Sequence, residues 1–148
     1  IEEITIWMKR LNASAGQLAL EFQSKSATDV TGYSLLGHGL EMANASQVGF
    51  RIHFDRLPFV KSAYHYAARG AFPGGAFDNY QYFKDQVTFT AVLDEPNQML
   101  LFDPQTSGGL LISVPVERLE GMLKRAAELN QPAWVIGEVI EGCGIEVV

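Results

Sequence analysis

The stretch that most constrains the fold of this chain is residues 27–38, ATDVTGYSLLGH, where the sequence changes from polar to apolar at Gly32. Threonines and an aspartate precede the glycine, and leucines and small residues follow it. Short hydroxyl and carboxylate side chains before an apolar face are typical of a loop that feeds the first turn of a helix. We therefore expect a loop up to Gly32 and a helix over about 33–45. The helix should be buried on most sides, because Glu41 is its only charged residue.

Asp29 is the candidate metal ligand of this stretch. The N-terminus of a helix presents unpaired N–H groups and a partial positive charge, so anions bind there. A carboxylate beside such a site suits Mg²⁺, which uses one or two carboxylates and completes its shell with water and phosphate oxygens. The alternative is that Asp29 caps the helix, which is the commoner role of such a residue.

The N-terminal segment carries an apolar stripe at spacings of three and four residues, which predicts helix. Polar or small residues at positions 12, 14 and 16 interrupt it, so we expect two helices or one kinked helix. Most charged side chains of the segment fall off the stripe, which is therefore expected to be core. Its members are Ile4, Trp7, Met8, Leu11, Ala15, Leu18 and Phe22.

Further strands and helices are expected along the rest of the chain. Apolar periodicity predicts helices over 60–69 and from Pro115 onward. Residues 71–83, rich in glycine, proline and aromatic side chains, are expected to form a packed loop, and residues 94–97 a turn. Alternating or β-branched residues mark the expected strands 48–54, 87–92, 110–114 (as a central strand), 133–140 and 144–148.

The composition indicates a globular domain. A chain of 148 residues is long enough for one domain with its own core, and 47% hydrophobic and 11% aromatic residues argue against disorder. The net charge of −6, without a basic stripe, argues against a nucleic-acid partner. No apolar run approaches the roughly 18 residues of a membrane helix. The single cysteine, Cys143, excludes an internal disulfide and is interpreted as a structural thiol in a reducing compartment.

A second candidate site is the turn 103–109, DPQTSGG. Its glycines permit the positive φ with which several backbone N–H groups converge on an anion. A tight turn that feeds a buried strand explains the same residues equally well, so both interpretations stay open. Asp103 is a candidate second metal ligand.

Other chemical signals are weak. No glycine–lysine pair is present, which excludes a P-loop, and Leu36 stands where a G-x-S-x-G nucleophile elbow needs its last glycine. His38, His53 and His65 lie on different expected elements without ligand spacing, so each is interpreted as structural, although His38 belongs to the first stretch. The aromatic residues of 71–83 are interpreted as a packed loop or an interface with another domain, rather than as a base-stacking surface.

Residues 27–38 resemble the motif that opens the C-terminal domain of the selenophosphate synthetase (selenide, water dikinase) family. Residues 101–111, LFDPQTSGGLL, resemble a second motif of that family. The sequence departs from the first motif at Tyr33 and Ser34, where the family has phenylalanine and glycine, and this change leaves Asp29 intact. The likeness covers essentially the whole chain. Shorter similarities are Leu11–Asn12, the PGG of 73–75 followed by Asn79, and the IGEV of 136–139.

The resemblance implies an α+β fold, a mixed β-sheet of four or five strands with helices packed on it. The wider aminoimidazole-ribonucleotide-synthetase-like enzymes share this domain. Residues 1–148 would be a single domain, the C-terminal half of a two-domain enzyme whose N-terminal nucleotide-binding domain is absent here. The start at isoleucine rather than methionine favours the same view.

The implied reaction converts ATP, selenide and water into selenophosphate, AMP and phosphate with Mg²⁺. In the family, the aspartate at the place of Asp29 helps to bind the metal ions that bridge the nucleotide phosphates. The other metal aspartates and the reactive cysteine or selenocysteine lie in the N-terminal domain. The resemblance therefore implies Asp29 as a metal ligand, a loop shaped by Thr28, Thr31 and Gly32, no catalytic residue in this chain, and an inactive isolated chain.

The partners that the resemblance implies are ATP and selenide in the full enzyme, the enzyme's own N-terminal domain, and a second copy in a cytoplasmic homodimer. No nucleic acid and no membrane are expected. One alternative is another enzyme of the superfamily, such as a purine-biosynthesis synthetase, a thiamine-phosphate kinase or a hydrogenase-maturation protein. A second alternative is a free-standing binding module. The LLGH of 35–38 and the intact DPQTSGGLL of 103–111 favour the selenium enzyme.

Overall fold

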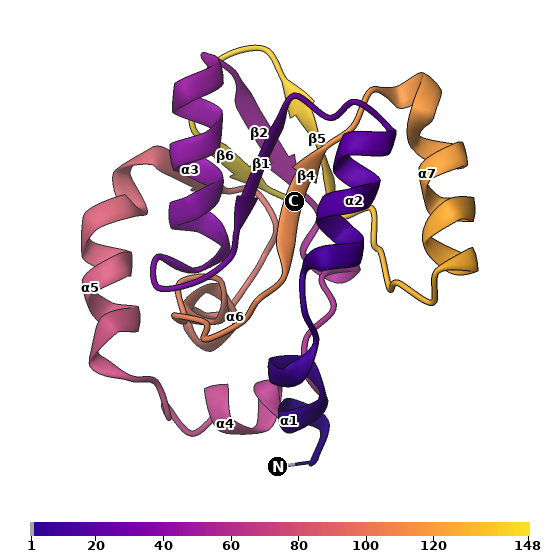
Figure 1. The fold of residues 1–148 in the computed structure, drawn as a ribbon. Coiled ribbons are helices and arrows are strands. Elements are labelled where there is room, and N and C mark those ends of the chain that lie inside the picture. The colour runs from indigo at the N-terminus through magenta and orange to yellow at the C-terminus, as the bar shows by residue number, and fades with distance from the viewer. Residues whose placement is uncertain (1) are drawn as a thin grey trace.

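The computed structural model describes residues 2–148, so Ile1 lies outside the described part of the chain. A four-stranded mixed sheet has the order β3-β6-β2-β5 (Figure 1). Both β2 and β3 run parallel to β6, and β5 is antiparallel to β2. The α+β fold with a mixed sheet is therefore confirmed. The four strands are β2 (Gly49–Ile52), β3 (Val87–Phe89), β5 (Gly137–Ile140) and β6 (Ile145–Val147), each inside an expected strand.

A separate two-stranded antiparallel sheet consists of β1 (Ser26–Asp29) and β4 (Leu110–Ser113). The expectation of a loop before Gly32 is wrong for β1, because backbone pairing with β4 makes a strand of four residues with no apolar alternation. The expectation that 110–114 is a central strand is also wrong. Within the described residues β4 pairs only with β1, and its four residues are half-buried.

Helix α3 (Ser34–Ser46) packs against both sheets, as the low charge of this segment predicts. A Cβ placed on Gly39 would lie 3.1 Å from Cδ1 of Ile145 in β6 and 3.8 Å from Cδ2 of Leu111 in β4. The glycine therefore permits the close approach of helix and sheets. The main core lies around this contact. Its buried members are Leu36, Leu40, Met42, Ala43, Phe50, Ile52, Phe83, Leu101, Phe102, Ile145 and Val147.

A smaller core forms where α2 (Ala13–Glu21) packs on α7 (Val116–Glu128). Leu18 of α2 meets Met122 and Ala126 of α7 there. The helix expected from Pro115 is confirmed, with Pro115 itself at the N-cap. Figure 1 shows the two helices side by side, next to β4.

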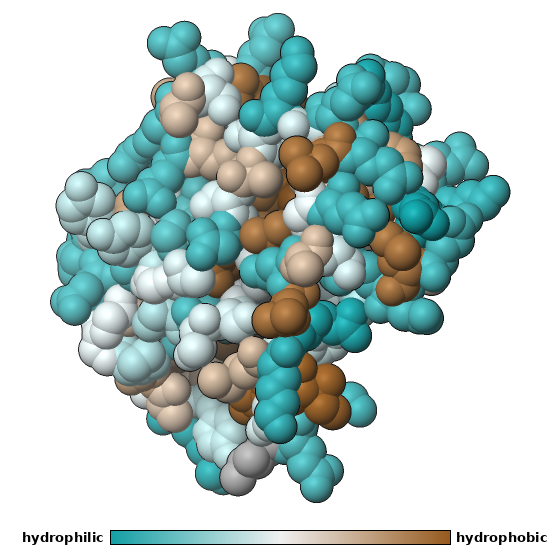
Figure 2. Space-filling view, in the orientation of Figure 1, coloured by the Kyte–Doolittle hydropathy of each residue, from teal (hydrophilic) through white to brown (hydrophobic). Residues whose placement is uncertain are grey.

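The N-terminal stripe is only partly core. It is split between α1 (Glu2–Lys9) and α2, as the interruptions predict, but α1 has no buried side chain. Leu11 is 79% exposed, and of the stripe only Leu18 is fully buried. Trp7 packs on Trp134, with ring centroids 5.9 Å apart. Figure 2 shows apolar side chains scattered among polar ones on the face that carries α1 and α2.

Two further expectations are wrong in the middle of the chain. The packed loop of 71–83 is helix α5 (Gly74–Phe83) for most of its length. The turn of 94–97 is the start of helix α6 (Glu95–Leu100), because the carboxylate of Asp94 caps it by accepting from the N–H of Asn97 at 3.1 Å. The helix expected over 60–69 is confirmed but shorter, as α4 (Ala63–Ala67). Short 3₁₀ turns lie at η1 (Phe54–Arg56) and η2 (Lys84–Gln86).

None of the helices in residues 2–148 is long and apolar enough to cross a membrane.

Candidate functional site

The two motif stretches lie against each other through the β1–β4 ladder. Asp29 is paired with Leu110, at the end of β1 (Figure 1). The contact continues beyond the strands. The N–H of Val30 donates to the carbonyl of Gly109 at 3.0 Å, and the N–H of Gly108 donates to the carbonyl of Val30 at 2.9 Å. The structure therefore joins two segments that the sequence singled out separately.

The turn after Asp29 is fixed from two further sides. The N–H of Gln105, in the second motif, donates to the carbonyl of Thr31 at 3.0 Å. The side-chain amide of Asn79, on α5, donates to the carbonyls of Gly32 at 2.9 Å and Phe102 at 3.0 Å. Asn79 is only 7% exposed, so its amide is the buried link between both motif segments.

The sequence alone gives Asn79 no role, although the residue belongs to one of the shorter similarities to the family. The signal that could have found the link is a polar residue on the apolar side of an amphipathic segment. That signal is hidden when 71–83 is interpreted as a loop, since a loop has no apolar side.

Ser34, one of the two departures from the family motif, begins α3 in an unusual conformation. Its φ is +64°, in the left-handed region that favours glycine. The residue is 1% exposed, and its hydroxyl donates to the carbonyl of Leu101 at 2.7 Å. The serine therefore combines a strained backbone with a buried hydrogen bond to the segment that leads into the second motif.

His38 contacts the same turn from the second turn of α3. Its Nε2 lies 3.0 Å from Oγ1 of Thr31 and 3.2 Å from the N–H of Tyr33. Its Nδ1 lies 2.9 Å from Oε2 of Glu41. His53 and His65 have no such arrangement. Among the described residues, His65 contacts the ring of Tyr66 at 5.3 Å between centroids.

Asp29 is exposed at the end of β1. The expectation that it caps the helix is wrong, because Tyr33 is the N-cap of α3 and no side-chain cap bond is formed there. The carboxylate makes no hydrogen bond or ion pair with any described residue. No group of three His, Cys, Asp or Glu side chains suited to a metal occurs within residues 2–148. Asp29 can therefore contribute one ligand, and a complete metal site needs oxygen donors from elsewhere.

Asp103, the other candidate ligand, is engaged within its own turn. The side-chain amide of Gln105 donates to its Oδ2 at 3.0 Å and to its backbone carbonyl at 2.9 Å. Burial raises the pKa of the Asp103 carboxyl, and the hydrogen bond from Gln105 opposes the rise. Asp103 is half-buried and its carboxylate is already engaged by Gln105, whereas the carboxylate of Asp29 is exposed and unengaged among the described residues, so Asp29 is the better candidate of the two.

The remaining candidates are Cys143 and the aromatic residues of 71–83, and neither forms a site for a ligand. Cys143 is an exposed free thiol at a turn before β6. The aromatic residues of 71–83 divide between core and surface. Phe83 is buried and Tyr80 packs edge-on against Phe102, whereas Tyr82 is 77% exposed. They do not form one base-stacking surface.

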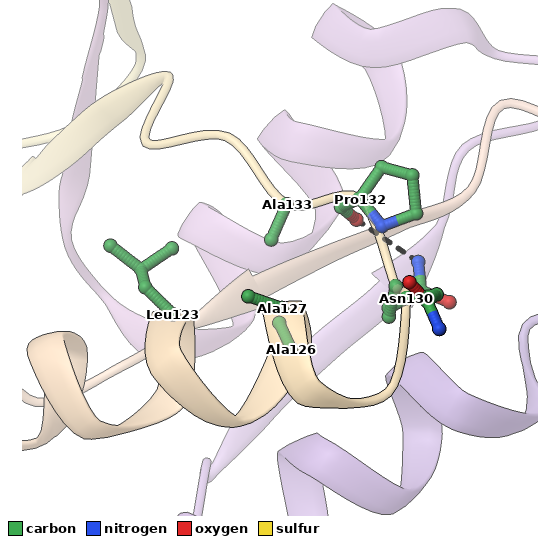
Figure 3. A pocket seen from close by; sticks show the side chains of 7 residues that line it. Leu123, Ala126, Ala127, Asn130, Pro132 and Ala133 are labelled. Atoms are coloured by element: carbon green, nitrogen blue, oxygen red, sulfur yellow. Dashed lines mark hydrogen bonds between the residues drawn. The ribbon is translucent and has the colours of Figure 1, made fainter.

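The described surface includes two hollows of different character. One, of about 220 Å³, is lined by residues of the motif turn. The other, of about 460 Å³, lies between the end of α7 and the segment that follows it, and Figure 3 shows a lining of apolar side chains on one side and polar amide groups at Asn130 on the other. No ionisable side chain lines the second hollow, whereas Tyr33 and His38 line the first. The lining of the first hollow is Thr31, Gly32, Tyr33 and His38.

The family model described as "AIR synthase related protein, C-terminal domain" matches residues 6–148, and the chain belongs to this family. Relatives with the name selenide, water dikinase match nearly all of it. The protein of Clostridium botulinum (strain Eklund 17B) is 38% identical over 141 residues, which are 95% of this chain and 41% of the relative. The protein of Pseudomonas aeruginosa is 39% identical over 135 residues, 91% of this chain and 38% of the relative. The resemblance of the two motifs is thereby confirmed, and the chain spans about two fifths of these relatives.

Solved structures agree on the fold. Thiamine-monophosphate kinase from Stenotrophomonas maltophilia aligns with a TM-score of 0.57 and 17% identity, over 90% of this chain and 34% of that one. HypE, a hydrogenase maturation protein of Escherichia coli, aligns with a TM-score of 0.55 and 22% identity, over 88% of this chain and 33% of that one. These similarities show the fold alone.

Proposed function

We propose that this chain is the C-terminal domain of a selenide, water dikinase, which makes selenophosphate from ATP, selenide and water with release of AMP and phosphate. The observation that carries the proposal is the joining of the two motif stretches through Val30 and the glycines at 108 and 109, with Asp29 exposed at the junction. The names of relatives that match nearly the whole chain support the same reaction.

Asp29 is proposed as the residue of this chain that holds Mg²⁺. Its carboxylate is exposed and engaged with no described side chain, which suits a ligand that completes its shell on an incoming ion. When bound, the ion neutralises phosphate charge and orients the nucleotide. The rest of this chain contributes rigidity, because the turn after Asp29 is held by backbone bonds to the second motif and by Asn79.

A single metal ligand is not sufficient for phosphoryl transfer from ATP. In this proposal a nucleotide-binding domain of the same polypeptide supplies the other metal ligands, the ATP site and the reactive residue, and the enzyme is a cytoplasmic homodimer. Residues 1–148 alone should then not turn over ATP. Asp103 stays a weaker proposal for a second ligand.

The test uses the full-length polypeptide that contains residues 1–148. ³¹P NMR follows selenophosphate formation from ATP and selenide at several Mg²⁺ concentrations, for the wild type, Asp29→Asn and Asp55→Asn. Asp55 is a matched control, because it is another exposed aspartate, placed on η1. Since loss of a group that merely supports a ligand costs about 10–100-fold, Asp29→Asn should lower activity at least tenfold, and Asp55→Asn should leave it unchanged.

Two results would contradict the proposal. If the full-length protein phosphorylates thiamine monophosphate and makes no selenophosphate, it is a different enzyme that uses the same fold. If it neither binds nor consumes ATP, the chain is a non-catalytic module. If Asp29→Asn makes selenophosphate at the wild-type rate, Asp29 is not a metal ligand, and the proposed reaction still stands.

A further inference from the structure

We propose that His38 is a positioning residue, oriented by Glu41, which holds the turn of Thr31 and Tyr33 and so fixes the direction in which Asp29 presents its carboxylate. The inference rests on the proposed function in one respect, namely that Asp29 is a metal ligand. His38 is not a catalytic residue in this proposal, because it acts through the turn and not on substrate.

The hydrogen bonds of His38 determine where its proton lies. A carboxylate only accepts hydrogen bonds, so Nδ1, 2.9 Å from Oε2 of Glu41, must carry a hydrogen. The backbone N–H of Tyr33 only donates, so Nε2, 3.2 Å away, must present its lone pair. The hydroxyl of Thr31, 3.0 Å from Nε2, can donate to the same lone pair. The neutral Nδ1–H form of the ring therefore satisfies all three partners.

Packing fixes the ring in this position. The His38 side chain is 13% exposed, whereas that of Glu41 is 54% exposed. The ring of Tyr33 lies on one side of it, with centroids 5.3 Å apart. A Cβ on Gly37 would lie 2.7 Å from Cβ of Tyr33, so the glycine beside His38 permits this approach. A ring held in this way can define the path of the backbone it contacts.

The turn held by His38 is continuous with the candidate ligand. Thr31 follows Asp29 by two residues, and its carbonyl is also bound by the N–H of Gln105 at 3.0 Å. The second motif therefore binds the backbone carbonyl of Thr31. His38 binds the hydroxyl of Thr31 and the backbone N–H of Tyr33. Both nitrogens of His38 are used in this arrangement, so neither is available as a general base.

Two substitutions separate the contact of His38 with Glu41 from its contact with Tyr33, and a third serves as the control. In His38→Gln the side-chain oxygen can still accept from Tyr33, but the donor to Glu41 is lost. In His38→Asn a donor toward Glu41 remains, but the acceptor for Tyr33 is lost. His65→Ala is the control, since His65 is exposed on α4.

Two quantities are measured. EPR gives the affinity of the full-length protein for Mn²⁺ in the absence of turnover, and thermal unfolding gives the midpoint temperature. Loss of a group that orients a ligand weakens metal binding about 10–100-fold. His38→Asn should therefore raise the Mn²⁺ dissociation constant about tenfold or more. His38→Gln should stay within a few-fold of the wild type, and His65→Ala should match the wild type.

A merely structural His38 would give another pattern. Both His38 variants would then unfold at lower temperature while binding Mn²⁺ as the wild type does, and this result would overturn the inference. A second measurement does not depend on any variant folding. Long-range ¹H–¹⁵N NMR of the wild type at neutral pH should show the Nδ1–H form of His38, and an Nε2–H form would overturn the proposal.

The same experiments separate this inference from the proposed function. A protein that makes no selenophosphate, yet loses Mn²⁺ affinity in both Asp29→Asn and His38→Asn, would refute the reaction and support the positioning role. If Asp29→Asn leaves Mn²⁺ binding unchanged, the positioning role is refuted whatever the reaction is.

Discussion

Gly108 lies directly against Val30. Its N–H donates to the Val30 carbonyl at 2.9 Å, and a Cβ placed on Gly108 would lie 2.7 Å from that carbonyl oxygen and 2.8 Å from Cγ1 of Val30. Real Cβ atoms do not approach other atoms so closely, so a side chain at 108 must push the two segments apart. The joining of the two motif stretches therefore depends on a residue without a side chain.

We predict that Gly108→Ala weakens this contact. Insertion of a methyl group into a packed contact typically costs about 1–3 kcal/mol, and the free energy of unfolding measured with urea should fall by that amount. Gly16→Ala is the matched control. Gly16 lies within α2 with no atom near its absent Cβ, so alanine should stabilise the helix by up to about 1 kcal/mol. Equal urea midpoints for Gly108→Ala and the wild type would refute the close contact.

The buried amide of Asn79 gives a second prediction. In Asn79→Ala, the carbonyls of Gly32 and Phe102 lose their donor, and an unpaired buried polar group costs about 1–3 kcal/mol. We expect a loss of roughly 2 kcal/mol or more in urea unfolding. Asn79→Asp should be worse at neutral pH, because a carboxylate would face two carbonyl oxygens.

Asn44 provides the control for Asn79. Its amide donates at 3.1 Å to Gln86, and both side chains are exposed. Water can replace this bond, so Asn44→Ala should change the free energy of unfolding by less than about 0.5 kcal/mol. If both asparagine variants behave alike, Asn79 does not link the two motif segments.

At Ser34 two opposing effects act on stability, a strained backbone and a buried hydrogen bond. Its left-handed backbone favours glycine, whereas its hydroxyl bonds the carbonyl of Leu101 at 2.7 Å. Ser34→Ala keeps the strain and loses the bond, which should cost about 1 kcal/mol. Ser34→Gly also loses the bond but removes the strain, and should lie close to the wild type. Thermal unfolding should therefore rank alanine below glycine, and the reverse order would show that the strain is not felt at this position.

The strand β1 could not be predicted from its own residues. Ser26–Asp29 has no apolar alternation, and its stability comes from backbone pairing with β4, which lies far away along the chain. Helices α3 and α7 were predictable because their apolar residues repeat with helical period. Local pattern therefore identifies elements that bury a side-chain face and misses an element formed by backbone pairing.

The helix α5 shows a second limit of local pattern. Pro73 and two glycines at its start predict a loop, yet the helix forms because Ala76, Asn79 and Phe83 face the rest of the protein. The ring of Phe83 lies 2.6 Å from the position of an absent Cβ on Gly37. This tertiary contact with α3 outweighs the weak intrinsic preference for helix.

The candidate site was predictable as a pair of motifs but not as one junction. Asp29 and the 103–109 turn stood out because their residue types suit ion binding. The bonds that join them involve backbone groups of Val30, Gly108 and Gly109, which no side-chain pattern reveals. The capping role that competed for Asp29 required the helix to begin nearer to it than Ser34.

Asp103 gives a prediction with a defined direction in pH. Burial raises the pKa of its carboxyl above the ordinary value of about 3.9, so between these two pKa values the folded protein binds more protons than the unfolded chain. Over that window the stability contributed by Asp103 falls as pH rises and returns on acidification. Asp103→Asn should therefore unfold at a higher temperature than the wild type at pH 7.

The difference between the two proteins should shrink as the pH is lowered through this window and vanish only below the unfolded-state pKa of about 3.9. Asp78→Asn, at an exposed aspartate on α5 for which no hydrogen bond to a described residue is formed, should track the wild type at every pH. Because the Asp103 side chain is only half-buried, water screens the effect and the shift in unfolding temperature should be small. A gap between Asp103→Asn and the wild type that widens on acidification would mean that the ionised carboxylate stabilises the turn, which is the opposite sign.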